Sequence, residues 1–172
     1  MTKDNSMQVE IFGNDTIFTR TVDAPRALVF KAWTDPVHLA KWWGPHGIEN
    51  PVCEVDLRPQ GRYRIVMRDD KGVDYPITGV YEEVVVPERI VSTVDTSEHS
   101  KDWHDLISKN RPGGGKAATE MRWTITFEEV GRKTKITIRT HFRSAADRDA
   151  FMKTGMAEGW SQSLERLETL VS

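Results

Sequence analysis

Five histidines, one cysteine and a group of closely spaced charged residues are the side chains with which this chain could do chemistry. Glu54 and Asp56 lie two residues apart, which would place two carboxylates on one strand face and suit acid–base catalysis. The same spacing lets them pair with Arg62 or Arg64 on the following strand, and we favour this structural interpretation. None of the histidines stands at a Cys/His spacing typical of metal sites. They are His38, His46, His99, His104 and His141.

Three further features have both a reactive and a structural interpretation. Cys53 has no obvious base beside it, which favours a small buried apolar side chain over a nucleophile. The basic face of Arg62, Arg64 and Arg68 could bind phosphate, but its acidic neighbours favour a solvated sheet surface. His46 could face the mouth of a cleft, although an ordinary loop residue is the simpler interpretation. The sequence also lacks a Gly-x-Ser-x-Gly motif, a phosphate loop and a dinucleotide fingerprint. We therefore predict no catalytic residue, no metal and no cofactor.

Length and charge narrow the class of protein. The chain has 172 residues, of which 38% are hydrophobic and 29% charged, and this composition suits one domain with a sizeable core. Lysine plus arginine number 24 and aspartate plus glutamate 26, so the net charge is −2. Such a balance gives no electrostatic footprint for nucleic acid or an anionic membrane. Without an apolar leader or a stretch near the ~20 apolar residues of a membrane span, we expect a cytoplasmic protein.

The first part of the chain reads as a strand followed by two short helices. We expect residues 1–15 to be a tail or a short edge strand, with a loose tail over residues 1–7. Thr16–Val22 is rich in β-branched residues and predicts a strand. One helix should run from about Pro25 to Trp33. The next should begin at Asp35-Pro36, where Asp caps and Pro fits the first turn, and end at Gly44-Pro45.

The rest of the chain predicts a sheet and a long helix. Residues 52–94 alternate with period two between short turns, which indicates an antiparallel meander, and two more strands should follow at 121–127 and 134–142. Between the meander and these two strands, residues 96–118 form a polar insertion, which we interpret as one or two helical turns within a mobile loop. A broad apolar face from Ser144 to the C-terminus predicts one long helix. This helix must cover the sheet, and the two short helices can close one end of the cleft between them.

Two glycines inside that predicted helix need a reason. Gly155, Gly159 and Ser163 lie four residues apart on one stripe. Each glycine in a helix interior costs about 0.8–1 kcal/mol relative to alanine. Close approach of a bulky sheet residue such as Trp123 or Tyr63 would explain them, as would space left for a ligand or a bend in the helix.

At four places the residues resemble the domains named after the activator of Hsp90 ATPase. The stretch 23–45 resembles the start of these domains, 55–63 and 79–84 their middle, and 155–167 their C-terminal helix. The similarity spans about residues 16–171 and implies an α+β helix-grip fold of the START/Bet v 1-like superfamily, with a curved antiparallel sheet around a long C-terminal helix and a cavity between them. Gln60 stands where the family usually has glycine. The insertion is longer than usual, so it could cover or reshape the cavity mouth.

We predict that the protein binds a small hydrophobic or amphipathic molecule between the sheet and the C-terminal helix. Aromatic and methionine side chains with few polar groups suit such a pocket, although they would equally form an ordinary core. The candidate lining residues are Trp33, Trp43, His46, Tyr63, Ile65, Met67, Tyr81, Trp123, Phe127, Met156, Gly159 and Trp160. Of Trp42 and Trp43, we expect one to pack inward and the other to lie nearer the cleft entrance beside His46.

Two other functions stay open. The family name suggests a co-chaperone that stimulates the Hsp90 ATPase, but the activator itself has a separate N-terminal domain for which this chain has no room. A cyclase- or hydrolase-like activity is the other alternative, because the superfamily includes such enzymes, although fold alone does not imply function. The expected partner is a small apolar ligand rather than nucleic acid or a membrane, and the chain could be a monomer or a homodimer.

Overall fold

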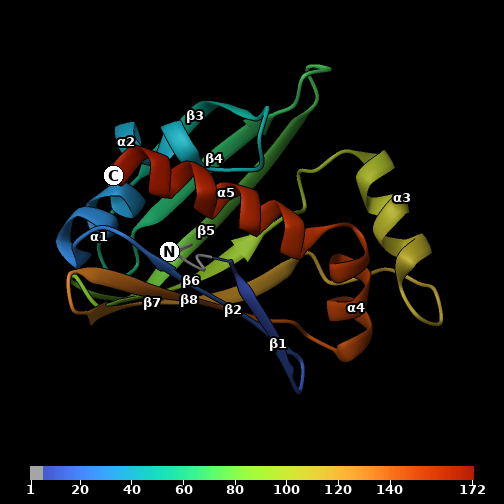
Figure 1. Cartoon of the computed structure of the whole chain (residues 1–172). Helices are drawn as coiled ribbons and strands as arrows, with labels where there is room; N and C mark the ends of the chain where they lie inside the picture. The colour runs from blue at the N-terminus through green and yellow to red at the C-terminus, as the bar shows by residue number, and fades with distance from the viewer. Residues whose placement is uncertain (1–5) are drawn as a thin grey trace.

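One curved antiparallel sheet is the framework of residues 6–172, which are the residues that the computed structural model describes (Figure 1). Its strands are β1 (Gln8–Phe12), β2 (Asp15–Val22), β3 (Glu49–Val55), β4 (Arg62–Arg68), β5 (Asp74–Val85), β6 (Arg89–Asp95), β7 (Glu120–Val130) and β8 (Lys133–His141). Their order is β1-β2-β8-β7-β6-β5-β4-β3, and all neighbours are antiparallel. β1 is thus an edge strand. Most of the loose tail expected over residues 1–7 lies outside the described residues.

The helices lie on one face and at both ends of this sheet. They are α1 (Arg26–Thr34), α2 (Pro36–Trp42), α3 (Lys101–Asn110), α4 (Ala145–Lys153) and α5 (Met156–Val171). Figure 1 shows α5 running across the sheet, with α1 and α2 near one of its ends and α3 and α4 near the other. This arrangement confirms the predicted helix-grip fold. Within residues 6–172, no helix is both long and apolar enough to cross a membrane.

The two short helices begin and end where the sequence predicts. Asp35 ends α1 and caps α2, where its carboxylate accepts a hydrogen bond from the Val37 backbone N–H at 2.9 Å. Gly44, with a φ of 89°, then turns the chain away from the helix. Trp42 ties the helices together, because its ring is fully buried and its Nε1 donates to the Ala32 carbonyl at 2.8 Å.

The core lies between the sheet and α5. β7 shows the predicted period of two, since its apolar side chains are buried while the residues between them are more exposed. The buried residues of β7 are Met121, Trp123, Ile125 and Phe127. The facing helix α5 buries Trp160, Leu164 and Leu167. The apolar faces that the sequence assigned to these two elements therefore meet one another.

The helix predicted from Ser144 to the C-terminus is two helices rather than one. Ser144 caps α4 as expected, and its hydroxyl accepts from the Asp147 backbone N–H at 3.1 Å. α4 ends at Lys153, and Gly155 adopts a left-handed conformation, with φ 90° and ψ 26°, directly before α5. A change of chain direction is therefore the reason for glycine at 155, and α5 alone lies along the sheet.

The polar insertion carries a ten-residue helix, α3, which is longer than the one or two turns predicted. The Ser100 hydroxyl caps it by accepting from the Trp103 backbone N–H at 3.2 Å. Asp147 of α4 is 3% exposed, and its carboxylate accepts from Arg111 Nε at 2.8 Å and from the Ala118 backbone N–H at 3.1 Å. One buried carboxylate thus holds both ends of the glycine-rich loop of the insertion against α4.

Two surface features add to what the sequence pattern indicates. Arg64 lies directly opposite Glu54 in the pairing of β3 with β4, as expected, and it also forms an ion pair with Glu98 of the insertion at 2.7 Å. The sequence pattern could not show this pair, because it joins segments 34 residues apart. Gln60 has a φ of 69°, so the turn keeps the left-handed conformation that glycine favours, at a cost of about 1 kcal/mol.

Candidate ligand-binding site

An apolar pocket of about 190 Å³ lies between the sheet and α5 and is called the inner pocket below. β4, β5, β6 and β7 form its floor, α5 and α4 its roof, and the loop after α2 and the insertion its remaining walls. Its lining residues are Trp43, Gly44, Pro45, Met67, Ile77, Val94, Thr96, His99, Trp103, Met121, Trp123, Phe151, Met156, Gly159, Trp160 and Ser163. No lysine, arginine, aspartate or glutamate is among these described residues, so the pocket suits an uncharged, apolar occupant.

Three tryptophans from three different elements form one wall of the inner pocket. Trp43 follows α2, Trp123 lies on β7 and Trp160 on α5. Their ring centroids are 5.3 to 5.6 Å apart and their planes cross at 57° to 83°, which are favourable edge-to-face geometries. Each of the three rings therefore packs against the other two in the wall of the pocket.

Gly159 leaves open space in the roof of the inner pocket. A Cβ atom built at this position would meet no heavy atom within 4 Å, so no bulky sheet residue approaches it. Gly159 also lies inside α5, where its N–H donates to the Gly155 carbonyl at 2.9 Å, and its φ is not in the left-handed region. Close packing and a left-handed turn are therefore both excluded as reasons for this glycine, and the open space beside it supports the explanation that it leaves room in the pocket.

His99 is the titratable group in the wall of the inner pocket. It is 9% exposed and packs at 4.3 Å, centroid to centroid, against Trp103 and at 5.5 Å against Tyr75. Burial, helped by nearby His104, lowers the pKa of His99 to about 4, so the imidazole is neutral at pH 7. Neither ring nitrogen has a partner with hydrogen-bond geometry among the described residues, although the Pro76 carbonyl lies near enough to oppose the pKa shift weakly.

A second pocket, of about 530 Å³, adjoins the inner pocket beneath the insertion and is called the outer pocket. The two pockets share four wall residues, which are Thr96, His99, Trp103 and Phe151. The outer pocket is also lined by Lys101, His104, Asp105 and Lys116, and is more polar for that reason. The insertion therefore builds a more polar pocket that shares a wall with the apolar one.

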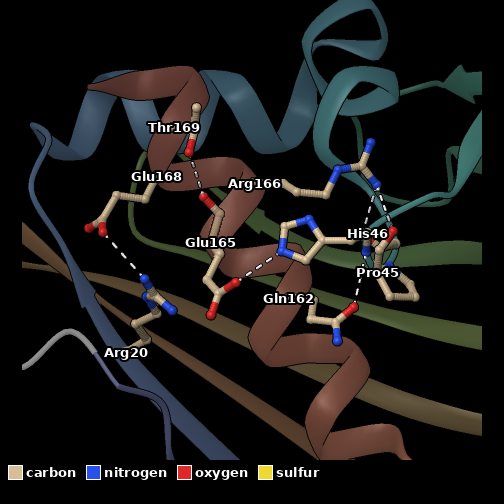
Figure 2. A network of polar contacts seen from close by, with 9 residues as sticks. Arg20, Pro45, His46, Gln162, Glu165, Arg166, Glu168 and Thr169 are labelled. Carbon is tan, nitrogen blue, oxygen red and sulfur yellow. Dashed lines mark hydrogen bonds and ion pairs between the residues drawn. The ribbon is translucent and has the colours of Figure 1, made fainter.

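A network of polar contacts fixes the loop that carries Trp43 into the pocket wall. Figure 2 shows α5 side chains reaching across to this loop. Arg166 donates through Nη1 to the carbonyls of Trp43, Gly44 and Pro45 at 2.8 to 3.1 Å, and through Nη2 to that of Lys41 at 3.0 Å. These carbonyls stand at the C-terminal end of α2, where a cation is favoured. Burial lowers the pKa of Arg166 from its usual value, but a guanidinium stays charged at neutral pH.

His46 belongs to the same network and not to the pocket. Its Nε2 lies 3.0 Å from Glu165 Oε2, and its backbone N–H donates to Gln162 Oε1 at 3.1 Å (Figure 2). Both side chains of the His46–Glu165 pair are at least half exposed, so the pair contributes little to stability. Trp42 packs inward and Trp43 lines the inner pocket, so the two tryptophans divide as expected. Trp43 is nevertheless buried, and His46 is not beside it in the pocket wall.

Half of the twelve predicted lining residues lie in the wall of the inner pocket. Those six are Trp43, Met67, Trp123, Met156, Gly159 and Trp160. Besides His46, five lie outside it, within the core: Trp33, Tyr63, Ile65, Tyr81 and Phe127. Trp33, for example, stacks on the far side of Trp160, with centroids 6.0 Å apart and planes 13° apart. Periodicity assigns a residue to the inner face of the sheet but does not say where along that face a pocket opens.

Sequence reasoning missed the wall residues that come from the insertion and α4. His99, Trp103 and Phe151 meet in space because α3 lies against α4, with the rings of Trp103 and Phe151 5.5 Å apart. The apolar positions 103 and 107 on α3 were a signal that this helix has a buried face. The sequence could not predict that this buried face of α3 packs against α4.

Cys53 and the possible metal ligands were the other candidates for reactive groups. Burial, with a contribution from Glu54, raises the pKa of the Cys53 thiol to about 11, so it stays protonated at neutral pH. Within residues 6–172, no three His, Cys, Asp or Glu side chains are grouped so that they could hold a metal ion. The site that the described residues do assemble is an apolar pocket with a few polar atoms in its wall.

Comparison with protein families identifies the class to which this fold and pocket belong. The family model described as activator of Hsp90 ATPase homolog 1-like protein matches residues 23–172. The chain belongs to this family, as the residue patterns at 23–45 and 155–167 suggested. A comparison with curated proteins gives no match.

Solved structures of similar proteins share the fold. A protein from Chromobacterium violaceum is 28% identical, with a TM-score of 0.72 over 92% of this chain and 96% of that one. A protein from Nitrosomonas europaea is 26% identical, with a TM-score of 0.74 over 91% and 92%. A Rhodobacter sphaeroides protein is only 19% identical, with a TM-score of 0.80 over 96% and 97%, and shows the fold alone. These three proteins are described without a ligand or an activity, so they carry no function over to this chain.

Proposed function

We propose that this protein binds a small hydrophobic or amphipathic molecule in the inner pocket. Gly159 is the observation that carries the proposal. Alanine at 159 would meet no neighbour and would favour the helix by about 0.8–1 kcal/mol, yet the residue is glycine and its missing side chain leaves room in the pocket roof. A helix that is less stable than it could be, at the wall of an apolar pocket, is typical of a site where function sets the residue.

The lining supports the hydrophobic part of this proposal and the neighbouring pocket the amphipathic part. Aromatic and sulfur-containing side chains dominate the inner pocket, and such side chains adapt well to apolar ligands. The outer pocket begins at the shared wall of His99 and Trp103 and carries Lys101 and Lys116. A molecule longer than the inner pocket could therefore place its apolar end between sheet and α5 and its polar end beneath the insertion.

Calorimetric titration with p-xylene and with 1-octanol tests the proposal. We expect saturable 1:1 binding, accompanied by a change in tryptophan emission, since Trp43, Trp123 and Trp160 line the pocket. Replacing Gly159→Leu should weaken binding at least tenfold, because the new side chain points into the space that the ligand would occupy. Glu158→Leu is the matched control, since it adds the same side chain to the same helix at an exposed position. The proposal fails if neither compound binds, or if the Gly159→Leu and Glu158→Leu variants bind equally well.

The other two functions are not supported by a specific observation. A role in stimulating the Hsp90 ATPase would rest on the description of the family. A cyclase- or hydrolase-like activity would rest on the fold, which many unrelated functions share. The inner pocket is the feature on which experiments can act directly.

A further inference from the structure

The polar atoms in the wall of the inner pocket indicate which chemical groups its ligand carries. Two wall residues carry buried nitrogen atoms that have no hydrogen-bond partner among residues 6–172: the imidazole of His99 and the indole Nε1 of Trp123. Leaving such groups unpaired is costly, and in native proteins they are nearly always satisfied by protein, water or ligand. Both residues border the same pocket, so one occupant of that pocket can supply the missing partners.

We infer that the ligand of the inner pocket is a small uncharged ring compound bearing a hydroxyl group, whose hydrogen bonds are supplied by His99 and Trp123. The inference rests on the proposed binding function and specifies its ligand. A hydroxyl is both donor and acceptor. A hydroxyl oxygen can accept from the Trp123 indole N–H, and a hydroxyl group can donate to the bare nitrogen of a neutral His99 imidazole. A purely apolar ligand would leave the Trp123 indole N–H without a partner.

The absence of charged side chains among the described wall residues of the inner pocket disfavours an ionised group inside it. Among the described residues in its wall, His99 is the only one that could carry a charge, and burial lowers its pKa to about 4. At neutral pH the wall is therefore uncharged, and a carboxylate or ammonium group would lose its hydration without gaining a counter-ion. A hydroxyl loses much less on entering the pocket, and the two unpaired nitrogens compensate for that loss.

The size and the walls of the pocket favour a single ring. The inner pocket measures about 190 Å³, and an engineered apolar cavity of roughly 150 Å³ in another protein is known to take up benzene. Trp43, Trp123 and Trp160 present ring edges and faces to its interior, so a flat aromatic body can pack against them in the usual edge-to-face manner.

Two compounds of the same shape test this inference. p-Cresol and p-xylene differ only in a hydroxyl in place of a methyl group, so their ratio of dissociation constants isolates the polar contact. We expect wild-type protein to prefer p-cresol. The preference should fall about fivefold to tenfold in His99→Phe, and similarly in Trp123→Phe, because a net hydrogen bond of ordinary strength corresponds to about that factor. Binding of p-xylene should change far less in the His99→Phe variant.

A measurement on the unaltered protein keeps the test valid if a variant does not fold. In NMR spectra of ¹⁵N-labelled protein, p-cresol should move the Trp123 indole N–H and His99 imidazole resonances, and p-xylene should move them much less. Saturable p-xylene binding without a preference for p-cresol, and without these shifts, would overturn this inference and leave the proposed function standing. Failure of both compounds, and of 1-octanol, to bind would overturn both.

Discussion

Replacing Gly159 by alanine should make the protein more stable, which is unusual for a substitution in the wall of a binding site. Alanine is favoured over glycine in a helix interior by about 0.8–1 kcal/mol, and the new methyl group meets no atom within 4 Å that could oppose this gain. Unfolding entropy of about 2.1 cal/mol/K per residue gives roughly 0.36 kcal/mol/K for 172 residues. The melting temperature should therefore rise by about 2–3 °C, measurable by calorimetry.

Gly155→Ala is the matched control, because it makes the same chemical change four residues earlier. A Cβ atom at Gly155 also meets nothing within 4 Å, so at both positions the effect of alanine depends on backbone conformation rather than on crowding. The φ of 90° at Gly155 is strained for alanine, and this variant should lose about 1 kcal/mol. Opposite signs at the two positions are the expected result. A destabilised Gly159→Ala protein would refute the reasoning, because it would mean that the space beside α5 is filled.

Two further predictions concern groups that hold the walls of the pocket. His99 has a pKa of about 4 in the folded protein, set by burial and His104 against the opposing charge of Asp95, so below its ordinary value of 6.5 the unfolded chain takes up the proton first. The contribution of His99 to the free energy of unfolding should be fully present above pH 6.5, and the free energy of unfolding should fall by about 2–3 kcal/mol between pH 7.5 and 4.5. In urea unfolding experiments, the His99→Phe variant should show a fall that is smaller by that amount. A pH dependence that is the same in both proteins would contradict the assignment. Arg166→Met removes the donor to the carbonyls after α2, so it should lower the free energy of unfolding by about 2 kcal/mol in the same assay and weaken p-xylene binding. His46→Ala should lower the free energy of unfolding by less than about 0.5 kcal/mol. Equal losses of stability in the two variants would show that the Arg166 contacts do not hold the wall.

Much of the fold could be predicted from the sequence, because its signals are local. The Asp35-Pro36 start and Gly44 end of α2, and the alternation along β7, depend on neighbouring residues whose backbone geometry is fixed by capping, left-handed turns or the period of two. The order of these elements and the apolar faces of the sheet and α5 then leave few ways to build one core. The same local rules failed at Gly155, where a glycine in a helical pattern can be either an interior residue or a stop.

The tertiary structure alone decided what the glycines and the insertion do. Gly155 and Gly159 look alike in the sequence, yet one changes the direction of the chain and the other leaves space in a pocket, because only the packed neighbours and the value of φ distinguish them. His99 enters the wall for a similar reason: Asp147 of α4 holds both ends of the loop that follows α3, through contacts between residues 36 and 29 positions apart. Long-range contacts of this kind depend on how the folded helices and strands pack against one another, and the residue pattern of a single segment does not contain this information.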